Sequence, residues 1–206
     1  MAAAVAAREY DLAFLHVSYG QRTERRELRA YGEIADFYRV TRRLVVDARA
    51  LSAIGGSSLT DLSMPVPEAE MGRREVTTTY VPFRNAHLLC IGVSWAEVLG
   101  AKKVYVGVEA DSGYPDCSAA FIGAFNRAVV EGTRPGSGIE VTAPLVHMDK
   151  AEIVRLGTKL GAPLHLTWSC YQREDAACGR CDSCALRRRG FRLADVKDSI
   201  AYANVD

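Results

Sequence analysis

The sequence predicts an α/β fold in which a mostly parallel, open sheet is flanked by helices. Short apolar runs that end at turn residues alternate with segments whose apolar side chains recur at helical intervals. The connecting segments are long enough for the crossover helices that parallel strands require. The 206 residues, 49% of them hydrophobic, show no internal repeat and suffice for one core, so we expect a single domain, 1–206. Ligands of such sheets bind beyond the carboxyl ends of the strands.

Hydrophobic periodicity places each element in order along the chain. Residues 2–9 look like the end of a helix that lacks an N-cap. Residues 48–79 lose all periodicity and are rich in glycine and proline, so we expect a long loop, a kind of segment that is usually functional or disordered. Strands are expected at 11–18, 43–47, 103–108 and 139–143, and helices at 23–38, 85–99, 118–131 and 150–160.

Charge and apolar patterning exclude some classes of partner. Lys and Arg total 26 against 25 for Asp and Glu, so the net charge of +1 gives no bulk attraction to nucleic acid or to anionic membranes. No apolar run approaches the roughly 20 residues of a membrane helix, and the first ten residues lack the features of a signal peptide. We therefore expect a cytoplasmic protein with no membrane association and no direct nucleic-acid partner.

Four of the six cysteines fall within fifteen residues near the C-terminus: Cys170, Cys178, Cys181 and Cys184. Two Cys-x2-Cys steps that share Cys181 set three sulfurs on one tight turn, and Cys170 supplies a fourth corner. In a reducing compartment this spacing predicts a closed, structural zinc site within a zinc-binding segment at residues 166–190. An iron–sulfur cluster and unligated thiols remain as alternatives.

The remaining cysteines and the basic runs are interpreted as structural. Cys90 falls on the apolar face of the helix expected at 85–99 and should be a buried small hydrophobe. Cys117 is also given a structural role. The mixed-charge run 22–29 and the arginines at 187–189 are interpreted as solvated helix faces.

Polar side chains after a predicted strand could bind a small ligand. Asp111, Tyr114 and Asp116 follow such a strand, where carboxylates accept from the N–H groups of a heterocycle and a tyrosine ring stacks on it. The alternative is an ordinary turn that caps the next helix, with Asp116 as the capping acid. Arg84 and Asn85 stand at the start of a helix, a position that attracts phosphate or carboxylate groups.

Five motifs in register resemble one known family. The motifs are Tyr19-Gly20-Gln21, Ile54-Gly55-Gly56-Ser57-Ser58-Leu59-Thr60-Asp61, Tyr80-Val81-Pro82-Phe83-Arg84-Asn85, Ser112-Gly113-Tyr114-Pro115-Asp116-Cys117 and Leu166-Thr167-Trp168-Ser169-Cys170-Tyr171. Together with the cysteine cluster, their order and spacing resemble the 7-cyano-7-deazaguanine synthase family of PP-loop ATP pyrophosphatases. The likeness spans nearly the whole chain, and the combination is far more specific than any one motif.

The resemblance implies an adenine nucleotide α-hydrolase-like fold and an ATP-dependent ligase of the queuosine pathway. The substrates would be 7-carboxy-7-deazaguanine, ammonia and ATP with Mg²⁺, and the product the nitrile 7-cyano-7-deazaguanine. A carboxylate oxygen is a poor leaving group, so each of two steps would transfer AMP to an oxygen before its loss. The resemblance also implies a homodimer and zinc at the four clustered cysteines. The residues expected at the substrate or the nucleotide are Arg84, Asn85, Asp111, Tyr114 and Asp116.

The sequence departs from the family pattern at its start. Family members open with a strand and a Ser-Gly-Gly-x-Asp-Ser loop whose backbone N–H groups bind pyrophosphate. We expect the chain to begin downstream of that loop, so that the domain lacks its first strand and the PP-loop. Two interpretations are open: the natural protein is longer, or the polypeptide is short and binds ATP poorly.

Two other functions fit the sequence less well. One is a non-catalytic, zinc-stabilised binding module that keeps only the heterocycle pocket. The other is a PP-loop relative that modifies tRNA, which the near-neutral charge disfavours because several phosphate contacts require a concentrated basic face.

Overall fold

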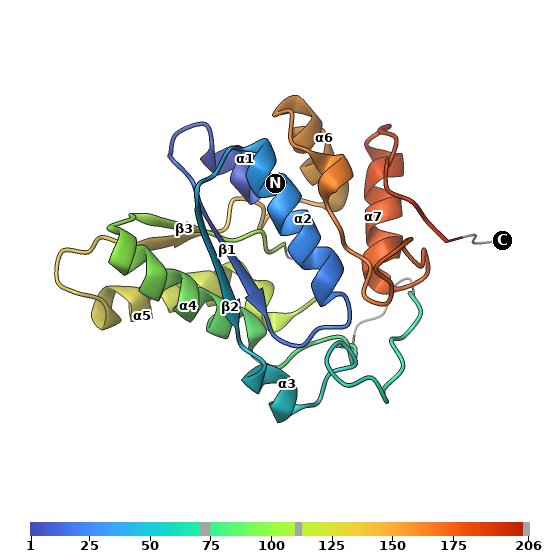
Figure 1. Ribbon diagram of the computed structural model, residues 1–206, viewed down its shortest axis with the longest axis horizontal. Coiled ribbons are helices and arrows are strands. Elements are labelled where there is room, and N and C mark those ends of the chain that lie inside the picture. Colours follow the sequence, from blue (N-terminus) through green and yellow to red (C-terminus); the bar gives the residue numbers. More distant parts are fainter. Residues whose placement is uncertain (71–74, 110–112, 204–206) are drawn as a thin grey trace.

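The computed structural model describes residues 1–70, 75–109 and 113–203, and the α/β class is confirmed (Figure 1). The helices are α1 (Ala2–Ala6), α2 (Glu24–Phe37), α3 (Ala50–Ile54), α4 (Arg84–Leu99), α5 (Ala119–Gly132), α6 (Lys150–Lys159) and α7 (Asp182–Leu193). The strands are β1 (Ala13–Ser18), β2 (Arg42–Asp47), β3 (Lys103–Tyr105) and β4 (Glu140–Thr142). Among these described residues, no helix is both long and apolar enough to cross a membrane.

The strands form two parallel pairs, each closed by a crossover helix. β1 pairs with β2 after the crossover through α2, and β3 pairs with β4 after the crossover through α5. Within the described part of the chain, β1 and β3 share no hydrogen-bond ladder. The strands therefore do not form the single sheet that the sequence predicts. Side-chain packing joins the pairs instead: a Cβ added to Gly92 of α4 would lie 3.2 Å from Val104 of β3 and 3.8 Å from Leu15 of β1.

Helices cover both faces of β1. Tyr31 of α2 donates a hydrogen bond to the carbonyl oxygen of Phe14, and the two rings lie 6.4 Å apart. The next residue, Leu15, points to the opposite face, where α4 packs closely through Gly92. α4 then shares one apolar core with α5 and β4, to which Leu89 and Val141 belong.

Most predicted elements agree with the structure within a few residues, and the exceptions have physical causes. Gly100, at φ +68°, ends α4 as predicted. The strand predicted at 103–108 ends at Tyr105, because its partner β4 has only three residues. α3 lies within the predicted loop 48–79 and was not predicted, since five residues are too few to show a helical period.

Two of the structural interpretations are wrong about exposure. Cys90 is exposed, because α4 is apolar nearly all round and its sequence does not mark the buried face. Arg187 is buried rather than solvated, with its side chain 9% exposed, and it forms an ion pair of 2.8 Å with Asp198. Its guanidinium also donates to the Thr167 hydroxyl. Arg187 therefore fastens the segment after α7 to the segment before the cysteines.

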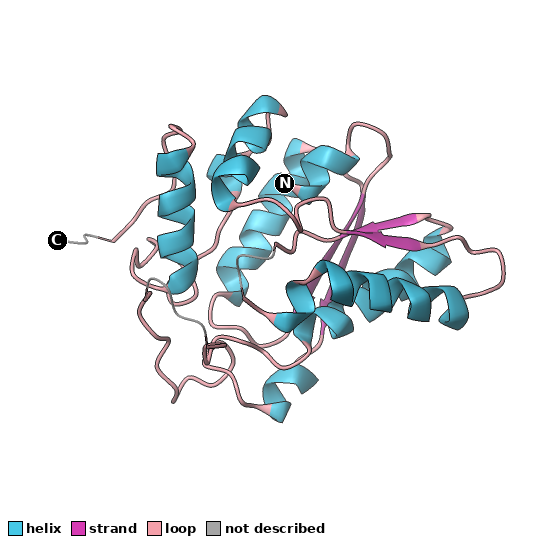
Figure 2. Ribbon diagram, turned by 180° about the vertical axis from the view of Figure 1, so that it is seen from behind, coloured by secondary structure: helices cyan, strands magenta, loops and turns pink. Residues whose placement is uncertain are grey.

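α6 and α7 stand side by side in both views (Figures 1 and 2). A glycine permits this close approach: a Cβ on Gly190 of α7 would lie 2.7 Å from the Cβ of Lys150 at the start of α6. Asp149 and Glu152 form a capping box at the same end of α6. Because Cys181 is the N-cap of α7 and Cys184 lies within that helix, the packing of α7 on α6 also anchors one end of the cysteine segment.

Candidate metal centre and adjoining pocket

The four clustered cysteines come together in space. Their sulfur atoms all lie within 4.8 Å of one another, and all four side chains are buried: Cys170, Cys178, Cys181 and Cys184. The Cys178 and Cys184 sulfurs are 3.9 Å apart, close to the separation of about 3.8 Å that tetrahedral Zn–S bonds of about 2.3 Å produce. A disulfide would need about 2.05 Å. The four sulfurs could therefore hold one metal ion.

The local backbone builds this centre. Cys181 is the N-cap of α7, so Cys184 follows in its first turn. The backbone N–H of Cys178 donates to the Cys170 sulfur and that of Cys181 donates to the Cys178 sulfur, both at 3.3 Å. Gly179 has a φ of +73°, which a side chain would disfavour, and so permits the tight turn between the cysteines. Amide donors directed at sulfur favour thiolates, the form that binds metal.

A pocket of about 250 Å³ lies beside the cysteines, at the carboxyl end of β1. One wall comes from the turn between β1 and α2, and the other from the cysteine segment. Ser169 and Tyr171 flank Cys170, and Ser183 lies between two of the clustered cysteines. The lining residues are Tyr19, Gln21, Arg22, Thr23, Glu27, Leu59, Arg84, Trp168, Ser169, Tyr171 and Ser183.

One carboxylate in the pocket, that of Glu27, is held by its own helix and turn. Its two oxygens accept hydrogen bonds from the Thr23 hydroxyl at 2.7 Å and from the Gln21 amide at 3.0 Å. Gln21 is itself fixed, because its side-chain oxygen accepts from the backbone N–H of Tyr19. Burial raises the pKa of Glu27, although these hydrogen bonds oppose the shift.

Arg84 supplies a cation to the same pocket. It donates a hydrogen bond of 3.1 Å to the Tyr19 hydroxyl, and its guanidinium carbon lies 5.7 Å from the centre of that ring. Burial acts to lower the pKa of Arg84, but Tyr19, Tyr171 and Asp116 together outweigh it, so the pKa is raised and the charge is kept. The second arginine of the lining, Arg22, donates instead to the carbonyl oxygens of Ser58 and Asp61.

The other predicted binding residues lie behind Arg84. The Asp116 carboxylate accepts from the backbone N–H of Asn85 at 2.9 Å, so it caps the start of α4. The predicted alternative was a cap on the next helix, but Ser118 fills that position on α5. The Tyr114 hydroxyl forms a hydrogen bond of 2.7 Å with Thr79, and it also bonds to a lining residue, Tyr171. Asp111 lies outside the described residues.

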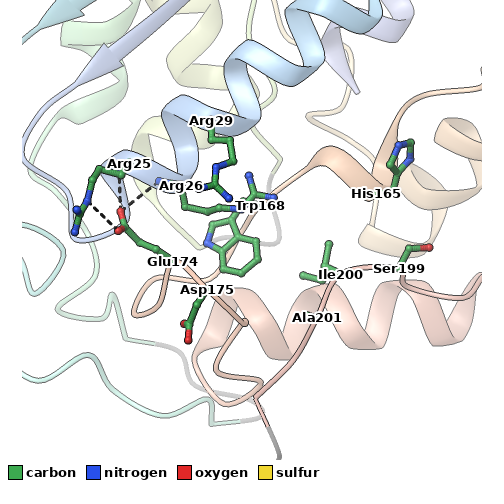
Figure 3. Close-up of a pocket in the computed structure, with 10 residues that line it drawn as sticks. All are labelled: Arg25, Arg26, Arg29, His165, Trp168, Glu174, Asp175, Ser199, Ile200 and Ala201. Atoms are coloured by element: carbon green, nitrogen blue, oxygen red, sulfur yellow. Dashed lines mark hydrogen bonds and ion pairs between the residues drawn. The ribbon is translucent and has the colours of Figure 1, made fainter.

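A second and larger pocket, of about 610 Å³, opens on the surface between α2 and the C-terminal segment (Figure 3). Here the Glu174 carboxylate accepts from the backbone N–H groups of Arg25 and Arg26, and so caps α2. Arg26 lies over Trp168, with its guanidinium carbon 4.8 Å from the ring centre. Because Trp168 lines both pockets, it forms part of the wall between them.

The sequence analysis did not predict that Glu27 lines a pocket. It treated the whole run 22–29 as a solvated face, but Glu27 is partly buried and lines the pocket. The available signal was its spacing from Thr23, because residues four apart on a helix face the same side. The turn at Tyr19-Gly20-Gln21 precedes this helix, and the turn and the helix face with Thr23 and Glu27 together line the pocket.

Comparison with known proteins decides the family. The family model described as "Queuosine biosynthesis protein QueC" matches residues 1–195. The chain belongs to the QueC family. The resemblance found in the sequence motifs is therefore confirmed.

Curated relatives of the QueC family match nearly the whole chain. A 7-cyano-7-deazaguanine synthase of Chlorobium luteolum is 54% identical over 202 residues, covering 97% of this chain and 89% of the relative. The one from Chloroherpeton thalassium is 52% identical over 195 residues, covering 94% and 86%. The one from Koribacter versatilis is 54% identical over 207 residues, covering 98% and 87%.

Proposed function

We propose that the chain is a 7-cyano-7-deazaguanine synthase, which converts 7-carboxy-7-deazaguanine and ammonia to 7-cyano-7-deazaguanine in queuosine biosynthesis at the expense of ATP. The observation that carries the proposal is a small pocket at the carboxyl end of β1, lined by the Glu27 carboxylate and the Arg84 guanidinium, in a chain more than half identical to curated synthases. A binding module without catalysis is not favoured, because these relatives are synthases.

The side chains around the pocket suit the first part of this chemistry, which is to bind and orient the acid. Arg84 is the proposed partner of the substrate carboxylate, because it keeps its charge and lines the pocket. Asn85 and Asp116 position Arg84 by fixing the start of α4. Tyr114 positions Tyr171 in the wall. Asp111 remains proposed at the substrate or the nucleotide.

The proposed metal is zinc, in a structural role. Four thiolates complete a tetrahedron and leave no coordination position for a substrate. The ion would tie the chain before Cys170 to α7 and so hold Ser169, Tyr171 and Ser183 in the pocket wall. Reduced cysteines at metal-binding spacing are usual in a reducing compartment, which supports a cytoplasmic location.

The Ser-Gly-Gly-x-Asp-Ser loop that the family resemblance assigns to the phosphates of ATP is not among the described residues. The Gly55-Gly56-Ser57-Ser58 run is unsuitable, because both serines are fully buried. We propose that a further strand with a Ser-Gly-Gly-x-Asp-Ser loop supplies the cradle for the phosphates. In the described part of the chain, β1 and β3 each pair with a single strand, so each keeps an edge to which such a strand could add.

A homodimer is also proposed. Exposed apolar side chains on and next to α4 and α5 offer a surface for a second copy, with Phe83 58%, Val98 76% and Val130 71% exposed. Light scattering is expected to give twice the mass of one chain. A single-chain mass at micromolar concentration would contradict this part of the proposal.

The test of function compares two proteins: the 206-residue chain, and the same chain preceded by the proposed strand and loop. Each is given 7-carboxy-7-deazaguanine, ammonia and ATP with Mg²⁺, and the nitrile and pyrophosphate are measured by mass spectrometry and a coupled assay. The extended chain should form nitrile only when ammonia is present, and the 206-residue chain should release little pyrophosphate. No nitrile from the extended chain contradicts the function, whereas rapid turnover by the shorter chain contradicts the location of the cradle.

A further inference from the structure

We propose that Glu27 is the residue that recognises the guanine-like edge of the substrate, by accepting hydrogen bonds from its ring N–H and its 2-amino group. The inference rests on the proposed function and deepens it. It assigns a specificity-determining role to a residue that the sequence motifs do not mark, and it makes Glu27 and Arg84 the two ends of one recognition site.

The size of the pocket fits a single heterocycle. Its volume of about 250 Å³ lies just below the range of about 300–1,000 Å³ that is usual for drug-sized ligands. A bicyclic ring with one carboxylate fits this space, but a nucleotide with its phosphates does not. Tyr19 and Trp168 supply aromatic surface in the lining, where a planar ring would be in contact with them.

Glu27 has spare capacity to accept hydrogen bonds. An ionised carboxylate offers about four lone-pair sites on its two oxygens. The described contacts of the side chain, to Thr23 and Gln21, use one site on each oxygen. Two sites therefore remain, one on each oxygen, which is the arrangement that a pair of adjacent N–H donors requires. The same contacts fix the rotamer of Glu27, so little conformational entropy is lost on binding.

The donor pattern of the ligand explains why a carboxylate suits this position. The guanine edge carries a ring N–H next to an exocyclic amino group, and both are donors. Adenine has an acceptor at the corresponding ring nitrogen, which a carboxylate would repel. Glu27 would therefore select guanine-like rings over adenine-like rings, which matters in an enzyme whose other substrate is ATP.

The positive charge of Arg84 determines which way round the ligand binds, because it attracts the ligand's carboxylate. Arg84 carries the cation that can meet a carboxylate, since Arg22 is occupied by backbone carbonyl oxygens. The Ser169 hydroxyl also lines the pocket, and its oxygen is buried with no hydrogen-bond partner among the described residues. A buried hydroxyl without a partner is unfavourable, so it independently indicates a polar ligand at this position.

The test measures binding by calorimetry with the full metal-loaded chain and no ATP. The two probes are 7-carboxy-7-deazaguanine and the same compound without its 2-amino group. The wild-type protein should bind the amino compound roughly 10- to 100-fold more tightly, the range for a charge-assisted hydrogen bond. Glu27→Gln should bind the amino compound more weakly by a similar factor and should lose the preference. Asp36→Asn, an exposed acid on the same helix that does not line the pocket, should keep both.

Each outcome bears on a different claim. Wild-type protein that binds neither probe overturns both the proposed function and the role of Glu27. Wild-type protein that binds both probes equally overturns the role of Glu27 alone, and this arm needs no variant. A folded Glu27→Gln protein that keeps the preference for the amino compound shows that Glu27 only supports Thr23 and Gln21.

Discussion

The candidate metal centre and the pocket share a wall, but their residues come together in different ways. The four clustered sulfurs come from fifteen consecutive residues, so their spacing along the chain already determines much of their geometry. The pocket draws on the turn after β1, on Leu59, on the start of α4 and on the cysteine segment. The comparison teaches that local spacing can define a metal site, whereas a ligand pocket depends on how distant segments pack.

The largest effect is expected from Cys181→Ser. Structural zinc contributes about 10–16 kcal/mol to the folding of small zinc domains, so losing one ligand should remove the metal and lower the thermal midpoint by at least about 10 °C. Metal analysis and thermal unfolding measure both effects. Cys90→Ser, an exposed cysteine outside the cluster, is the matched control and should change neither. A Cys181→Ser protein that keeps its stability without metal would contradict the structural role.

A smaller loss of stability is expected from Arg187→Ala. This change removes the contacts of Arg187 with Asp198 and Thr167 but leaves the four clustered cysteines intact. Its partner Asp198 is only 10% exposed and would be left buried without its cation, at a loss of about 3–5 kcal/mol. Urea unfolding measures the difference. Arg189→Ala, an exposed arginine on the same helix, should stay close to wild type. Equal stability of the two variants would show that the ion pair contributes little.

Asp116→Ala tests whether Asp116 contributes to substrate affinity as well as to the stability of the fold. Loss of the cap on α4 should lower the free energy of unfolding by about 1–2 kcal/mol and should also weaken substrate binding, because Arg84 sits at the same helix start. Denaturant unfolding and calorimetry give the two values. Asp149→Ala removes the cap of α6, no residue of which lines the pocket, and should match the loss of stability with no loss of affinity. If Asp116→Ala and Asp149→Ala bind the substrate equally well, Asp116 does not position Arg84.

The smallest expected effect is a dependence of stability on pH through Asp198. Burial alone would raise the pKa of Asp198, but hydrogen bonds from Arg187 and Tyr202 outweigh it, so the pKa is lowered. The stabilisation is therefore complete above the unfolded value of about 3.9 and is lost as pH falls through the lower folded value. The advantage of wild type over Asp198→Asn should shrink as the pH is lowered from neutral to about 3. A constant difference in denaturant unfolding over that interval would rule out this linkage.

The alternation of elements could be predicted from the sequence because each helix and strand has its own period. The wrong predictions concern properties that hydrophobic periodicity does not determine. α4 is apolar nearly all round, so its outward face, with Cys90, could not be distinguished. The division of the sheet between β1 and β3 depends on which strands lie next to each other, a tertiary property.

The candidate site was predictable to the extent that it is local. The cysteine spacing predicted the cluster correctly, and Arg84 does line a pocket. Asp116 bonds to a residue that precedes it by 31 positions, so the sequence pointed to the wrong helix. Glu27 was assigned to a solvated face because its neighbours are charged, and only the packing of the cysteine segment against α2 encloses it.

The wall that the cysteine segment contributes to the pocket has a thermodynamic consequence. If the ion orders Ser169, Tyr171 and Ser183, then occupancy of the metal and affinity for the heterocycle are linked functions. Whatever factor the metal adds to heterocycle affinity, the heterocycle must add to metal affinity. A cell poor in metal but rich in the deazaguanine acid would thus keep more of this protein in its loaded form.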